Sequence, residues 1–151
     1  MSELQNPDGT PDVRVFDKNT DPIQWAVQGV LAYGGRPGYP RLDVPASVVD
    51  SWLTRVRQQG VRSVIVMLSD EYEMNVYYRH LDQPLIEYYS GAGLSVRCVS
   101  HMDRDVPVSD AILLARVRYA FEALPQPVLI QCSAGLERSR DAALALSRIR
   151  G

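Results

Sequence analysis

The chain is poor in cysteine and in long apolar runs. These two shortages argue against a disulfide-rich secreted domain and against a membrane-spanning helix. Only Cys98 and Cys132 occur in 151 residues, too few for the disulfide framework of a small secreted domain. No stretch has the roughly 18 consecutive apolar residues of a spanning helix, and the first twenty residues lack the apolar region of a signal peptide. We therefore expect a cytoplasmic protein whose thiols stay reduced.

Lysine is also scarce, and the chain has no excess of positive charge. Lys18 is the only lysine, the formal net charge is -2, and the isoelectric point is about 5.6. General binders of nucleic acid or of membrane surfaces carry a strong positive balance, so we expect neither kind of partner. Any anion site must be local. The use of arginine in place of lysine is compatible with a bacterial source.

Length and composition predict one folded unit. A chain of 151 residues with 46% hydrophobic content can bury one good core. Residues 1–20 are rich in turn formers such as Asn-Pro-Asp-Gly, which predicts an N-terminal arm or tail. Residues 21–151 are then the folded domain.

The hydrophobic pattern alternates between strands and helices along this domain. The run 61–68 is almost continuously apolar, as in a strand that is covered on both faces. Alternation of this kind predicts a three-layer α/β fold with a mainly parallel central sheet and helices on both faces. We expect strands at 23–31, 61–68, 94–99 and 128–130, and helices at 45–59, 70–81, 84–92, 109–124 (capped by Ser109) and from 141 onward.

Two groups of side chains in this pattern have alternative interpretations. The tyrosines of residues 70–92 are expected to pack their rings on the sheet with their hydroxyls at the surface. Alternatively, Tyr72 with Glu71 and Glu73 lies on the rim of a ligand site at a strand end. Cys98 is expected to be a small core residue, and the alternative is a redox partner for Cys132.

One short motif carries most of the chemical information. It reads Gln131-Cys132-Ser133-Ala134-Gly135-Leu136-Glu137-Arg138-Ser139, between an apolar strand and a helix-forming run. Loop amides and a helix N-terminus that converge there favour an anion, and the same field favours a cysteine thiolate. Arg138 adds a planar charged fork suited to two phosphate oxygens. This arrangement predicts a nucleophile inside a phosphate cradle.

The pattern Cys-x-x-Gly-x-x-Arg-Ser from Cys132 to Ser139 resembles the signature of the cysteine-dependent protein tyrosine phosphatase superfamily, in particular its dual-specificity-like branch. The resemblance implies that Cys132 attacks phosphorus and forms a phosphocysteine, and that Ser139 helps the thiolate leave in the second step. It implies neither a metal nor an organic cofactor. The family usually has a histidine where this chain has Gln131. The phosphate would be bound by the residues of the loop, Ser133, Ala134, Gly135, Leu136, Glu137 and Arg138.

Cleavage of a phosphomonoester also needs a proton donor for the leaving oxygen. In the family this general acid is an aspartate on a loop, often a few residues before a proline. In this chain the corresponding loop follows the predicted strand 94–99. Asp103 fits that place best, ahead of Pro107. Asp105 is the alternative, and a third reading makes both ordinary loop carboxylates. His101, close to a strand end, is expected to be structural.

The expected function is hydrolysis of phosphomonoesters, on a phosphorylated protein or a small molecule. A polyanionic inositol or lipid phosphate is a weaker alternative, because the loop has no lysine or histidine and Glu137 is acidic. A phosphate-binding module with little or no turnover is a second alternative, favoured by Gln131 and Glu137. A third is rhodanese-like sulfur transfer, for which the arginine spacing is less suitable.

Overall fold

The protein forms a five-stranded sheet in the order β1-β2-β5-β3-β4. The computed structural model describes residues 23–68, 71–100, 110–132 and 137–150, so the expected arm at residues 1–20 lies outside it. Strands β2, β5, β3 and β4 run parallel, and β1 pairs with β2 in antiparallel register. The strands are β1 (Gln24–Val27), β2 (Leu31–Gly35), β3 (Ser63–Leu68), β4 (Ser95–Ser100) and β5 (Val128–Cys132).

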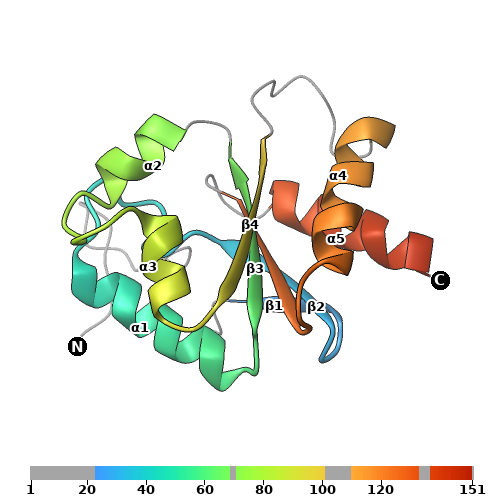
Figure 1. The fold of residues 1–151 in the computed structure, drawn as a ribbon, viewed down its shortest axis with the longest axis horizontal. Coiled ribbons are helices and arrows are strands. Elements are labelled where there is room, and N and C mark those ends of the chain that lie inside the picture. Colours follow the sequence, from blue (N-terminus) through green and yellow to red (C-terminus); the bar gives the residue numbers. More distant parts are fainter. Residues whose placement is uncertain (1–22, 69–70, 101–109, 133–136, 151) are drawn as a thin grey trace, which may run out of the picture.

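Helices cover both faces of this sheet (Figure 1). Strand β5 shows why: Leu129 belongs to the apolar cluster on one face, and Val128 and Ile130 belong to the cluster on the other. The predicted three-layer α/β fold with a mainly parallel sheet is confirmed. One face carries α1 (Ala46–Gln58), α2 (Glu71–Tyr77) and α3 (Leu85–Gly91), and the other carries α4 (Ala111–Glu122) and α5 (Glu137–Arg150).

The segment 23–31 differs from the prediction of a single strand. It contains β1, a turn and the first residue of β2. The amide of Val30 donates to the carbonyl of Val27 at 3.0 Å, and Gly29 has φ +72°, a conformation that glycine adopts without steric cost. The apolar pattern continues through this turn, so periodicity alone gives no sign of it.

The cap of α4 also differs from the prediction. The side chain of Asp110 accepts hydrogen bonds from the amides of Ile112 and Leu113, both at 3.1 Å. Asp110 is therefore the capping residue, one position after the expected Ser109, which lies outside the described residues. Aspartate and serine are equally favoured at the N-cap, so residue preference alone could not decide which of these two neighbours caps the helix.

Two tyrosines place their hydroxyls inside the protein, contrary to expectation. Tyr78 donates to the carbonyl of Pro37 at 2.6 Å, and the fully buried Tyr89 donates to a side chain of β5. Tyr88 follows the prediction, with its hydroxyl on the exposed carboxylate of Asp50. The side chains of Glu71, Tyr72 and Glu73 lie outside the description, so their rim position stays a prediction.

Cys98 is exposed, so its assignment to the core was wrong. It lies on β4, which is at one edge of the sheet. An edge strand has no neighbour on its outer side, and a side chain near its open backbone remains accessible to solvent. The order of the strands depends on tertiary structure, so the local apolar pattern around Cys98 could not predict that its strand lies at an edge.

Candidate functional site

Cys132 is the last residue of the central strand β5. It pairs with Gly35 of β2 on one side and with Met67 of β3 on the other. The carboxyl ends of these parallel strands meet here, at the edge where open α/β sheets bind their ligands. Only 1% of Cys132 is exposed, and it packs in the same cluster as Ala142 and Ala143 of α5. The thiol is thus held between the sheet and the following helix.

Ser139, in the first turn of α5, contacts this thiol. The Cys132 thiol donates to the Ser139 hydroxyl oxygen across 3.5 Å, and that hydroxyl donates to the carbonyl of Gly34 at 3.2 Å. These contacts tie β5, β2 and α5 together at one buried point. If the thiol loses its proton, the single hydroxyl proton of Ser139 becomes a donor that the thiolate and the Gly34 carbonyl share or compete for.

Arg138 lies one residue earlier in the same turn of α5. Its Nη1 is buried and has no hydrogen-bond partner in the part of the chain that the structure describes. Buried polar groups are nearly always hydrogen-bonded, so this guanidinium nitrogen retains the capacity to donate to a further acceptor. Arg140, two residues later, is exposed and pairs with Asp141 at 3.6 Å. The two arginines of this turn therefore differ in environment.

Gln131 lies on the opposite face of β5 from Cys132, because side chains alternate along a strand. It is fully buried, and Tyr89 of α3 donates to its Oε1 at 2.5 Å. Its Nε2 has no hydrogen-bond partner within the described ranges. Burial raises the pKa of Tyr89 well above its ordinary value, so the phenol stays neutral and remains a donor. Tyr89 thus fixes the orientation of the amide next to the thiol.

The loop after β2 begins beside the site and contains a buried cation. Arg36 follows Gly35, is 4% exposed, and donates to the Tyr78 hydroxyl at 3.2 Å and to the Arg41 carbonyl at 2.7 Å. Its guanidinium carbon lies 4.6 Å from the centroid of the Tyr77 ring. A cation over an aromatic face is attracted by the ring quadrupole, and this contact holds the loop against α2.

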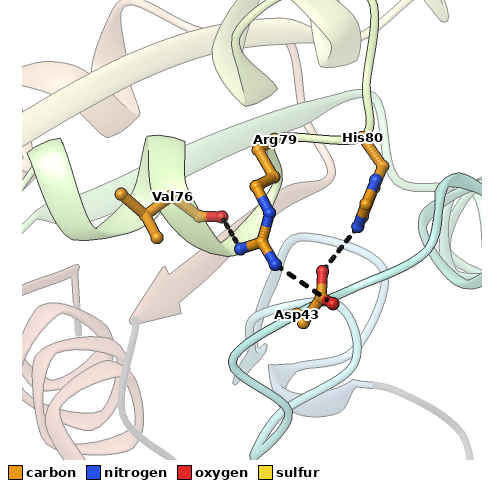
Figure 2. Close-up of polar contacts among 4 residues, drawn as sticks. All are labelled: Asp43, Val76, Arg79 and His80. Carbon is orange, nitrogen blue, oxygen red and sulfur yellow. Dashed lines mark hydrogen bonds and ion pairs between the residues drawn. The ribbon is translucent and has the colours of Figure 1, made fainter.

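The far end of this loop is held by Asp43 (Figure 2). Its Oδ2 lies 3.2 Å from Nη2 of Arg79, and its Oδ1 lies 2.6 Å from Nε2 of His80. Arg79 also donates to the Val76 carbonyl at 3.1 Å. These side chains are about half exposed, so the Arg79 ion pair and the His80 hydrogen bond each stabilise by at most about 1 kcal/mol, and their main effect is to fix the position of the loop.

The structure brings together part of the predicted site. Cys132 and Ser139 are in contact, and Arg138 lies in the same helical turn. Glu137 begins α5, but its side chain is outside the description. The remaining predicted residues also lie outside the described ranges, so their roles stay predictions; they are Ser133, Ala134, Gly135, Leu136, Asp103 and its alternatives Asp105 and His101.

Two features of the site were missed in the sequence. The Tyr89 to Gln131 hydrogen bond joins residues 42 positions apart, and no local pattern announces it. The role of Arg36 was not predicted either. The only available signal was a charged residue directly after a buried strand, among glycine and proline.

Within residues 23–68, 71–100, 110–132 and 137–150, no three histidine, cysteine or carboxylate side chains are close enough to hold a metal ion. Among the helices of those same ranges, none is long and apolar enough to cross a membrane.

Comparison with solved structures finds a distant likeness. The chain matches no protein-family model and no curated protein. Among solved structures it is similar to a mutant form of Tk-PTP, a protein tyrosine phosphatase, with a TM-score of 0.45 and 18% sequence identity. The match covers 85% of this chain and 82% of that one. A likeness at this level concerns the arrangement of strands and helices, and it does not extend to individual residues.

Proposed function

We propose that the protein hydrolyses phosphomonoesters through a phosphocysteine on Cys132. The observation that carries the proposal is the arrangement at the end of β5. A buried thiol contacts the Ser139 hydroxyl, and the same helical turn carries Arg138, whose buried Nη1 has no partner among the described residues. A nucleophile, a donor for its thiolate and an arginine with one unpartnered nitrogen among the described residues, all within eight residues, suit an oxyanion substrate.

The reaction follows two displacements. In the first, the Cys132 thiolate attacks phosphorus, an S–P bond forms and the bond to the leaving oxygen breaks, while Asp103 donates a proton to that oxygen. In the second, water attacks the phosphocysteine, Asp103 takes the water proton, and the S–P bond breaks to release phosphate. Ser139 donates to the departing thiolate. Arg138 binds two phosphate oxygens in both steps.

The substrate class proposed is a phosphorylated protein, with phosphotyrosine favoured, or a simple phosphomonoester. Glu137 stands beside Arg138 in the sequence and adds a negative charge at the start of α5. Additional phosphates on an inositol or lipid headgroup would be repelled by it. We therefore rank multiply phosphorylated substrates below singly phosphorylated ones.

A phosphate-binding module without turnover is the second candidate, and Gln131 is the observation that favours it. This residue directly precedes Cys132, its side chain is fully buried on the opposite face of β5, and its Nε2 lacks a partner in the described part of the chain. A glutamine amide is neutral at every pH and adds no positive charge near the thiol. Such a site would bind phosphate while leaving the cysteine a weaker nucleophile.

Turnover of p-nitrophenyl phosphate separates the two candidates, and two arginines of one helical turn supply the comparison. Arg138→Lys should lower kcat/KM by about 100-fold or more, because a lysine cannot replace a bidentate fork at the transition state. Arg140→Lys, on an exposed residue paired with Asp141, should leave it unchanged. Equal effects of the two variants, or no turnover by the natural protein, would remove the hydrolase proposal.

A further inference from the structure

A groove of about 700 Å³ lies between the edge strand β4 and helix α4. It is separate from the candidate site, because Cys132, Arg138 and Ser139 do not line it. Among its apolar lining residues, Val99 and Ala120 are buried, and Ala111 and Ala115 are exposed. The lining residues that the structure describes are Arg97, Cys98, Val99, Ala111, Ile112, Ala115, Arg116, Tyr119 and Ala120.

The groove reaches the open backbone of β4. Arg97 and Val99 pair with Ile65 and Met67 of β3, so both side chains point to the α4 face, while Cys98 points to the other face. Three consecutive residues can line one groove only where it passes along the strand's edge. In the described sheet β4 pairs with β3 alone. Its outer N–H and C=O groups are therefore a template for another strand.

The wall of the groove on α4 is apolar and exposed. Ile112, Ala115 and Tyr119 are three and four residues apart, so they share one face of the helix. Ile112 is 68% exposed and Tyr119 is 72% exposed. Two large apolar side chains on one face beside an open strand edge form a contiguous surface, which is typical of an interaction site.

The charges of the groove select the chemistry of its occupant. Arg97 of β4 and Arg116 of α4 are both exposed, and neither forms an ion pair with any residue that the structure describes. No aspartate or glutamate is among the lining residues that belong to the described ranges. The groove is thus a local positive site on a chain whose net charge is -2. An acidic ligand complements it, and a basic one is repelled.

We propose that this groove binds an extended acidic peptide segment of a partner protein, which adds to β4 as a sixth strand. Main-chain hydrogen bonds to the edge of β4 give the affinity. Side chains of the peptide at alternate positions face the groove, where a carboxylate meets Arg97 and an apolar side chain meets Val99 and Tyr119. A second carboxylate meets Arg116. The recognised pattern is an acid and an apolar residue two positions apart.

The test uses a fluorescein-labelled peptide, Glu-Thr-Val-Thr-Glu-Thr-Val, whose groove-facing positions alternate between acid and valine. Fluorescence anisotropy with the full chain should show saturable binding that weakens with salt. Arg97→Ala and Arg116→Ala should each weaken it about tenfold, because each removes one charge-assisted contact. Arg118→Ala is the matched control, since Arg118 lies on the same helix, pairs with Glu122 and does not line the groove.

Two altered peptides test the two parts of the proposal separately. The same sequence with lysine for glutamate should bind at least tenfold more weakly, and so should one with N-methylated main-chain amides at alternate positions. Binding that is unchanged in Arg97→Ala and Arg116→Ala, or equal for the lysine peptide, would overturn the proposal. So would self-association of the chain that these two variants abolish, because the groove would then hold a second copy. Arg97→Ala and Arg116→Ala should turn over p-nitrophenyl phosphate at the rate of the natural protein. The peptide-binding result therefore does not depend on whether the protein is a hydrolase.

Discussion

The hydrogen bond between Tyr89 and Gln131 can be tested by removing one hydroxyl. Tyr89→Phe keeps the ring, which stacks on Trp52 at a centroid distance of 5.4 Å, and removes only the donor to Gln131 Oε1. Both residues are fully buried, so no water replaces the lost donor. An unsatisfied buried acceptor costs about 1–3 kcal/mol. At about 2–4 °C per kcal/mol for a chain of this size, the midpoint of thermal unfolding should fall by about 2–12 °C.

Two comparison variants make this result specific. Tyr88→Phe removes the hydroxyl that donates to the exposed Asp50, and it should change the free energy of unfolding by about 0.5 kcal/mol or less. The double variant Tyr89→Phe with Gln131→Leu removes both polar partners, and it should be less destabilised than the sum of the single variants. Urea unfolding measures the natural protein, the single variants Tyr88→Phe, Tyr89→Phe and Gln131→Leu, and the double variant. The reasoning fails if Tyr89→Phe costs no more than Tyr88→Phe, or if the two changes in the pair are additive.

Three further predictions concern the site and its surroundings. Ser139→Ala should slow the second chemical step more than the first, because the departing thiolate loses its donor. A burst of p-nitrophenol followed by a slow steady state would show this. A uniform loss of rate without a burst would contradict it. Asp103→Asn should lower kcat for phenyl phosphate by about 100-fold, and Asp105→Asn by much less, with the opposite order assigning the acid to Asp105. Burial raises the pKa of Tyr78 from 10.0 to about 12, so its neutral form stabilises the fold fully below pH 10, and this contribution is lost as the pH rises from 10 to about 12. Urea unfolding across that range should show a shallower decline for Tyr78→Phe than for the natural protein; an equal decline would contradict the assignment.

The sequence was sufficient for the layers of the fold, because burial imposes a period on each element. The run Val61–Leu68 is apolar on both faces, and β3 is indeed covered from both sides. Features that depend on single residues were harder to predict from the sequence. Gly29 introduces a turn inside an apolar run, and Asp110 caps α4 next to an equally suitable serine. Neither changes the hydrophobic period on which the prediction depends.

The site was predictable only where it is local. Cys132, Arg138 and Ser139 lie within eight residues, so one strand, one loop and one helical turn bring them together. Their supports come from distant parts of the chain: Gly34 is 105 residues from Ser139, and Tyr89 is 42 residues from Gln131. These contacts depend on strand order and on which face each helix covers. The exposure of Cys98 was missed for the same reason.

The most direct test of the proposed mechanism is to look for the covalent intermediate. Full-length protein carrying Ser139→Ala is mixed with excess p-nitrophenyl phosphate, quenched with acid within milliseconds to seconds, digested and examined by mass spectrometry. We expect one added phosphoryl group on the peptide that contains Cys132, and neither that adduct nor turnover when Cys132→Ser is introduced. Undiminished turnover in Cys132→Ser, or turnover by the natural protein with the phosphoryl group on another residue, would contradict the account.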